Sequence, residues 1–297
     1  MENRGTSWAS LEVEAWGPTR ETLHMWLQIV GKLRMVGSPF VNHWWHVTFS
    51  LSARGLTTGA IPVDGGVLDI EFDLLDHRLV LRTSDGGREE LALTAMTVAE
   101  FYRRTFDALG RLGIALEIVP TPNEVVPAIP FAIDEEHCTY DSGQVHAFWQ
   151  QLIRADGVLR RLRAEFRGKA SPVHFFWGAL DLATTRFSGR PAPVHPGGVP
   201  NCPDRVMVEG YSDEISSSGF WPGGGREGAF YSYAYPEPAG YAETQVPKGA
   251  YYDPALGEFL LPYEVVRQAG DPEALALEFL RVTSAAAARL GEWPAIG

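Results

Sequence analysis

Four stretches of the chain place apolar residues at intervals of three and four, which predicts four long helices. The first begins at Pro18-Thr19 and ends at Gly37, the second follows a capping box at 97–100, the third begins at Asp141, and the last begins at Asp271-Pro272. Each predicted helix has one apolar face, so each is expected to pack against a sheet or another helix.

Alternating apolar and polar residues predict strands between these helices. In the first part of the chain, the expected strands are 45–53, 67–75, 78–83, 89–93 and 114–119, with a tight turn at 84–87. In the second part, they are 173–185, 205–211 and 229–235. Segment 173–185 is apolar on both faces, which is typical of a strand in the middle of a sheet.

The order of these elements predicts the α+β class with a mostly antiparallel sheet. A chain of 297 residues is long for one domain, and residues 120–130 contain four prolines. We therefore expect two halves, 1–133 and 134–297, each built as helix, strand, meander and helix.

Two segments of the chain are similar to each other. His43 and His174 follow related Ser-Pro sequences, and the same number of residues leads from them to Pro62 and Pro193. This similarity predicts an internal duplication in which the two segments form equivalent strands. Chance similarity between two amphipathic strands is the alternative.

Composition narrows the classes of function. Hydrophobic residues make up 45% and charged residues 21% of the chain, which excludes a disordered protein. The net charge of −12 argues against nucleic acid and anionic membranes as partners, because both need a basic surface. We expect no membrane span and no secretion signal, and hence a cytoplasmic protein.

The sequence offers little support for a metal or a cofactor. Cys138 and Cys202 are isolated, and the histidines lack the spacing of a metal motif. The three glycines at 223–225 are not followed by Lys-Ser or Lys-Thr, and no dinucleotide-binding fingerprint follows a predicted strand. We therefore expect neither a bound metal nor a cofactor.

Several long motifs resemble a known family. They are Asn42-His-Trp-Trp, Arg54-Gly-Leu-Thr-Thr, the segment 168–178, Thr185-Arg-Phe-Ser-Gly-Arg and Gly219-Phe-Trp-Pro-Gly. Together they resemble the bacterial domain-of-unknown-function family numbered 5996. More loosely, the resemblance extends to aziridine-forming enzymes of azinomycin-type biosynthesis. It implies ring closure by attack of an amine, with loss of an activated oxygen leaving group.

Asp181 is the first candidate for chemistry. In a strand over 173–185 its face would also hold Phe175, Trp177 and Ala183. A carboxylate among apolar neighbours has a raised pKa, as a general base does. The alternative is a structural ion pair with Arg186 or Arg190.

Tyrosines and a second carboxylate fall on neighbouring predicted strands. Glu209 and Tyr211 would share one face, and Tyr231 and Tyr233 would share another. Beside Asp181 they would form a small-molecule pocket, with Trp177 in its wall, Trp221 as a lid and His174 as a further acid or base. The alternatives are an exposed tyrosine face and, for the glycine-rich loop, a plain connector.

Basic residues after the central strand suggest an anion site. Arg186 and Arg190 flank Ser188, and guanidinium groups bind sulfate, phosphate or carboxylate in a bidentate manner. Arg54 occupies the corresponding turn of the first half. Segment 151–190 carries eight Lys or Arg and three Asp or Glu, a net +5, which suits an acidic carrier protein. Helix arginines that merely cover a solvated face are the alternative.

These features predict a cofactor-independent enzyme that acts on a small anionic substrate by general acid/base chemistry. Asp181 would be the base, assisted by Glu209, and Arg186 and Arg190 would hold the anionic group. The alternative is a non-catalytic binding or adaptor protein. An enzyme needs Asp181 to be open to substrate, whereas an adaptor favours Asp181 sealed in an ion pair.

Overall fold

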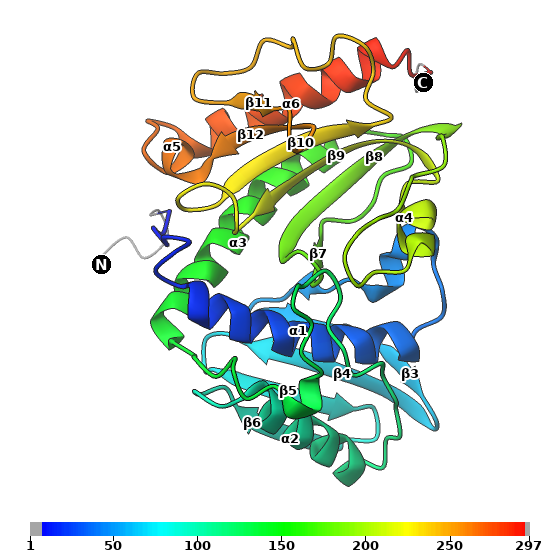
Figure 1. Ribbon diagram of the computed structural model, residues 1–297, viewed down its shortest axis with the longest axis vertical. Coiled ribbons are helices and arrows are strands. Elements are labelled where there is room, and N and C mark those ends of the chain that lie inside the picture. Colours follow the sequence, from blue (N-terminus) through cyan, green and yellow to red (C-terminus); the bar gives the residue numbers. More distant parts are fainter. Residues whose placement is uncertain (1–7, 295–297) are drawn as a thin grey trace.

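Two antiparallel sheets of six strands each form the centre of the computed structural model, which describes residues 8–294 (Figure 1). The first sheet has the order β1-β2-β4-β5-β6, with β3 paired to β4. Its strands are β1 (Ser50–Leu51), β2 (Gly55–Thr57), β3 (Ile61–Val63), β4 (Gly66–Asp73), β5 (Arg78–Thr83) and β6 (Arg88–Ala92).

The second sheet has the order β11-β12-β10-β9-β8-β7. Its strands are β7 (His174–Phe176), β8 (Asp181–Pro191), β9 (Asp213–Trp221), β10 (Ala229–Tyr235), β11 (Tyr251–Asp253) and β12 (Glu258–Pro262). With its helices and antiparallel sheets, the chain is an α+β protein, as the sequence predicts.

Helices cover one face of each sheet. The long ones are α1 (Gly17–Gly37), α2 (Val98–Arg111), α3 (Ser142–Ala164) and α6 (Pro272–Leu290), and shorter ones are η1 (Asn42–Val47), η2 (Phe131–Ile133), α4 (Asp204–Gly210) and α5 (Tyr263–Arg267). In Figure 1, α1 and α2 accompany the first sheet, and α3 and α6 accompany the second. None of the described helices is both long and apolar enough to cross a membrane.

The two sheets meet at a single antiparallel pair of residues. The amide of Phe49 donates to the carbonyl of Phe175, and the amide of Phe175 donates back, at 2.9 and 2.8 Å. The Phe49 ring contacts Phe72 of the first sheet, and the Phe175 ring contacts Phe148 of α3. Residues from both halves therefore share one continuous hydrophobic core on the helix side.

The predicted long helices are confirmed, and their N-terminal caps explain where they begin. The side chains of Thr97, Asp141 and Asp271 each accept a hydrogen bond from the backbone amide three residues further on. Such a cap satisfies an amide that has no partner within the helix. The meander of the first sheet and strand β10 also match the prediction.

The predicted central strand over 173–185 is wrong. Strand β7 ends at Phe176, the chain turns, and β8 starts at Asp181 and pairs back, so that Phe176 faces Asp181. Leu180 takes a φ of +63° in this turn. An uninterrupted apolar run gives no sign of such a turn, because Trp177, Ala179 and Leu180 of the turn are as apolar as the strands on either side, although Ala179 is exposed.

Other strand predictions also fail. Residues 205–210 of the predicted strand 205–211 lie in helix α4, and residues 114–119 form no strand. Of the predicted strand 45–53, residues 45–47 belong to the 3-10 helix η1 and residues 50–51 form β1. Strand β9 was missed because its centre is Ser216-Ser-Ser218, without the apolar alternation of an amphipathic strand.

Both halves of the chain follow the same order of elements: a long helix, a meandering sheet and a second long helix. The segments predicted to be equivalent nevertheless differ, because the first begins in η1 and the second begins in β7. The duplication therefore stays a prediction.

Candidate functional site

Asp181 accepts a hydrogen bond from a tyrosine two strands away. The hydroxyl of Tyr231 on β10 lies 2.5 Å from Oδ2 of Asp181 on β8, with β9 between them. The Tyr231 ring reaches across because Gly219 lies beneath it, and a Cβ at Gly219 would lie 2.4 Å from the phenol oxygen. This contact lies on the face of the second sheet that is turned away from α3 and α6.

Asp181 has no cationic partner among the described residues. It lies deep among protein atoms, yet solvent still reaches part of the residue. Burial raises the pKa of its carboxyl from 3.8 to about 6, and the Tyr231 hydrogen bond opposes part of that rise. Asp181 therefore combines two properties of a general base: a pKa near neutrality and access to solvent.

Glu124 brings a second carboxyl toward Asp181. It belongs to the proline-rich segment between the halves, and its Oε1 lies 2.3 Å from where a Cβ of Gly178 would be. Burial, and then the charge of Asp181, raise the pKa of Glu124 from 4.5 to about 7. Only a glycine at 178 leaves room for this carboxylate above the turn that leads to Asp181.

Glu258 contributes a third carboxyl from the start of β12. Leu260 pairs with Tyr231, so Glu258, two residues earlier, lies on the same face of the sheet. Burial raises the pKa of Glu258 from 4.5 to about 7, and the charges of Asp181 and Asp253 add to the rise. None of the three carboxyls, Glu124, Asp181 and Glu258, forms an ion pair within residues 8–294.

Two further phenols complete this carboxyl–phenol cluster. The hydroxyls of Tyr211 and Tyr233 lie 2.9 Å apart, and the rings of Tyr231 and Tyr233 stack at 6.0 Å. Burial raises the pKa of Tyr211 to about 12, and the charges of all three carboxyls add to this effect. His195 packs on the Tyr211 ring at 4.7 Å. Tyr211 is thus within electrostatic reach of every carboxyl in the cluster.

A ladder of polar side chains on α1 fixes the loop that carries Glu124. Nε2 of His24 lies 2.8 Å from the carbonyl oxygen of Gly178, and the Gln28 amide exchanges hydrogen bonds of 2.8 Å with the backbone of Asn123. Nζ of Lys32 donates to the Asn123 side chain. These residues recur every fourth position, so one face of α1 holds both the loop and the β7–β8 turn.

Unusual backbone conformations occur in three segments of this region. Glu124, Leu180 and Asn201 have φ values of +62°, +63° and +51°. Positive φ is costly for residues with a side chain, and such strain clusters at functional sites. The Asn201 side chain donates to the Val125 carbonyl at 2.5 Å, and Glu124 N donates to the Pro200 carbonyl at 2.9 Å. The segments of Glu124 and Asn201 therefore hold each other in place.

The arginines predicted to bind an anion have structural partners. Arg186 donates to the Leu162 carbonyl at 2.5 Å and to Ser284 at 3.2 Å, which places it on the helix side of the sheet. Strand alternation sends positions 181 and 186 to opposite faces, so the prediction that both line one pocket is wrong. Arg190 pairs with Glu214, which also accepts from Ser188.

Glu209 does not join the cluster through a strand face, because it lies on helix α4. Its Oε1 accepts a 3.0 Å hydrogen bond from the backbone amide of His43. His43 also lies 2.7 Å from Nζ of Lys169. Glu209 thus ties α4 to η1, whereas Tyr211, just beyond the helix, reaches the cluster.

The remaining predicted site residues divide into two groups. Trp221, predicted as a lid, is the last residue of β9 and packs, like Tyr233, against the small apolar cluster that contains Tyr231, so its role as a lid stays a prediction. The others are held by partners outside the cluster: Nδ1 of His174 lies 3.2 Å from Oγ1 of Thr48, Trp177 donates to the Val47 carbonyl, and Arg54 pairs with Asp73 and Asp76. Burial lowers the pKa of His174 to about 3, so its imidazole is neutral.

Basic side chains of segment 151–190 also form ion pairs with carboxylates of this protein. Arg160 pairs with Asp156, Arg161 pairs with Glu273, and Lys169 pairs with Asp213. The carboxylates that accept from these side chains neutralise much of the positive charge, which leaves the segment less able to attract an acidic partner than its sequence indicates.

The sequence model of a family of unknown function (DUF5996) matches residues 8–296. The chain belongs to this family. No curated protein and no solved structure matches it.

Sequence reasoning missed Glu124, Glu258 and Lys32 of this DUF5996 protein. Glu124 lies in a segment without periodicity, so nothing in the sequence assigns it to a face. Glu258 had a usable signal, since Pro254 and Gly257 mark a turn before the apolar run of β12. Lys32 lies among apolar residues of α1, and a lysine at such a position is expected to be buried with a partner.

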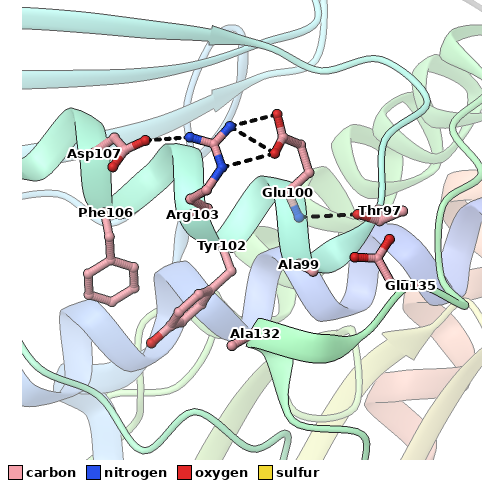
Figure 2. A pocket seen from close by; sticks show the side chains of 9 residues that line it. All are labelled: Thr97, Ala99, Glu100, Tyr102, Arg103, Phe106, Asp107, Ala132 and Glu135. Atoms are coloured by element: carbon pink, nitrogen blue, oxygen red, sulfur yellow. Dashed lines mark hydrogen bonds and ion pairs between the residues drawn. The ribbon is translucent and has the colours of Figure 1, made fainter.

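A separate hollow lies on the outer side of α2, next to η2 (Figure 2). Arg103, one of the residues that line it, bonds to Glu100 and Asp107, so both partners of its only basic residue are acidic residues of the same lining. None of the residues that line it belongs to the carboxyl–phenol cluster. Across residues 8–294, no three His, Cys, Asp or Glu side chains gather in a way that would hold a metal ion.

Proposed function

We propose that this protein is a cytoplasmic enzyme that moves protons on a small molecule at the carboxyl–phenol cluster. The observation that carries the proposal is Asp181, which lies deep in the protein and partly open to solvent, bonded to Tyr231 and without an ion pair to any residue of 8–294. An adaptor protein favours such a carboxylate sealed in an ion pair, because burial without a cationic partner destabilises the fold.

The three carboxyls are suited to opposite tasks. Asp181, with a pKa of about 6, is mostly ionised at neutral pH and serves as the base. Glu124 and Glu258, with pKa values of about 7, are protonated in a large fraction of molecules and serve as the acid. Neighbouring groups whose environments separate their pKa values are the usual arrangement of acid and base in an active site.

Ring closure by attack of an amine, which the family resemblance implies, is the finer form of this proposal. Asp181 would accept the proton of the attacking nitrogen as the C–N bond forms. The C–O bond would break, and Glu124 or Glu258 would protonate or stabilise the departing oxygen. Arg186 and Arg190 lend no support to an anionic substrate, because α3, Glu214 and the end of α6 occupy them.

Metabolite profiling tests the proposal on a mixture of candidate substrates. Purified protein is incubated with a metabolite extract of the source cell, in parallel with Asp181→Asn and with Asp64→Asn, which changes an exposed carboxylate. We expect one metabolite to be consumed and a product to form with the wild type and Asp64→Asn, but not with Asp181→Asn. Depletion without a product would favour the binding protein, and unchanged turnover by Asp181→Asn would exclude Asp181 as the base.

A further inference from the structure

Lys32 is a buried amine that no part of the acid/base proposal uses. It lies on α1 with 2% of its surface exposed, among the most deeply buried side chains of the protein. Its ammonium donates to Oδ1 of Asn123, and it has no ion pair with any described Asp or Glu. Lysine is almost never fully buried unless a carboxylate accompanies it, so its environment calls for a chemical explanation.

The environment of Lys32 favours the neutral amine. Burial lowers its pKa from 10.5 to about 8, and the nearest opposing influence is the Cys202 thiol. Near neutral pH, a group with this pKa holds roughly 300-fold more neutral amine than an ordinary lysine. Desolvation of this kind is the way in which enzymes activate lysine as a nucleophile.

A short polar path connects Lys32 to the surface. The Asn123 side chain accepts from Lys32 and donates to the carbonyl of Asn201, which is an exposed residue. Cys202 beside it is half-buried. Helix α4, which follows, has no buried residue. The segment from Asn201 through α4 is therefore held by hydrogen bonds and not by a packed core.

We propose that Lys32 is a carbonyl-binding amine, to which a small aldehyde or ketone that enters past Asn201 binds as an imine. The Nζ lone pair forms the N–C bond, and the carbonyl oxygen leaves as water. Both protons of that water come from the amine, and no oxidant or reductant is used. This inference goes beyond the acid/base proposal and does not depend on it.

Reductive trapping tests the inference on the wild-type chain. The protein is treated with acetaldehyde and cyanoborohydride near neutral pH, and peptide mass spectrometry follows ethylation of each lysine. The chain has three lysines, so exposed Lys248 and ion-paired Lys169 serve as internal controls. We expect Lys32 to react at least about tenfold faster than Lys248, and urea to abolish the difference. Reaction in the order of exposure, with Lys32 last, would overturn the proposal.

Two further measurements distinguish trapping at a buried, neutral Lys32 from the general reactivity of lysine. The trapping rate at Lys32 should level off above a pH of about 8, whereas the rate at Lys248 should continue to rise. Asn123→Ala, which removes the side chain between Lys32 and Asn201, should speed trapping at Lys32 and leave Lys248 unchanged. A rate at Lys32 that keeps rising in parallel with Lys248 would contradict the inference, whether or not the variant folds.

Discussion

Tyr231 and Asp181 lie on strands that are not neighbours, yet the phenol hydroxyl bonds to the carboxylate at 2.5 Å. The intervening strand contributes only Gly219 beneath the ring. This geometry couples the ionisation of Asp181 to one side-chain donor, so the effect of that donor can be measured separately from the effect of burial.

Removal of the Tyr231 hydroxyl should raise the pKa of Asp181. In Tyr231→Phe the carboxylate loses the hydrogen bond that opposes the effect of burial, so we expect its pKa to exceed about 6. Carbon-detected NMR titration of the Asp181 carboxyl measures this change. Tyr252→Phe, which removes a similar bond to Glu237 near the surface, is the matched control. An unchanged or lower pKa in Tyr231→Phe would show that the bond is not formed.

Asp181 should make the protein less stable as the pH rises. Its pKa of about 6 in the folded chain exceeds the ordinary value of 3.8, so folding favours the protonated form. Its stabilising contribution is therefore complete below pH 3.8 and is lost as the pH rises through about 6. The free energy of unfolding of the wild type should fall relative to that of Asp181→Asn over this interval.

Urea unfolding of both proteins at several pH values between 4 and 8 tests that expectation. The comparison removes the contribution of the buried histidines, which has the opposite sign. Glu124 and Glu258 are coupled to the charge of Asp181, so the difference reports Asp181 together with its effect on these two carboxyls. Asp64→Asn should follow the wild type throughout. A constant difference between the wild type and Asp181→Asn would contradict the raised pKa.

Gly178→Ala should displace Glu124 and leave the fold intact. The new Cβ would lie 2.3 Å from Oε1 of Glu124, but this oxygen is the end of a flexible side chain that can rotate away. We expect the free energy of unfolding to change by about 1 kcal/mol or less. The pKa of Glu124 should move from about 7 toward 4.5, as NMR titration would show. Gly110→Ala, on a helix where a Cβ meets nothing, is the control.

Arg186 should matter for stability. Arg186→Met removes the bonds to Leu162 and Ser284, which join β8 to α3 and α6. Loss of these bonds should lower the free energy of unfolding by about 1–3 kcal/mol. Chemical denaturation measures this loss, with Arg88→Met at an exposed ion pair as the control. If Arg186→Met were fully stable but lost turnover of a known substrate, the anion-binding prediction would regain support.

The helices of this protein were predictable because their signals are local. Thr97, Asp141 and Asp271 each cap a helix through a bond to an amide three residues away, and the apolar periodicity continues from there. The hairpin at 177–180 was not predictable in this way. Its residues are as apolar as the strands beside it, and the turn is evident only from the antiparallel pairing of β7 with β8 and the positive φ of Leu180.

The candidate site was predictable in part for the same reason. Asp181 and Tyr231 stand out as polar groups among apolar neighbours, so sequence reasoning found both. Glu124 and Lys32 owe their environments to contacts across the fold. Glu124 lies over the β7–β8 turn at Gly178, and Lys32 lies against Asn123. No spacing along the chain records such contacts.

Gly178 and Gly219 carry no functional group, yet they set the dimensions of the carboxyl–phenol cluster. Each supplies the space that another residue's polar end occupies. Every missense change of a glycine codon adds at least a Cβ, so any such mutation at these two positions alters the spacing of the cluster. Mutational scans should therefore find substitutions at these two glycines as damaging to function as substitutions of the carboxylates themselves. A search for function restricted to reactive side chains would overlook them.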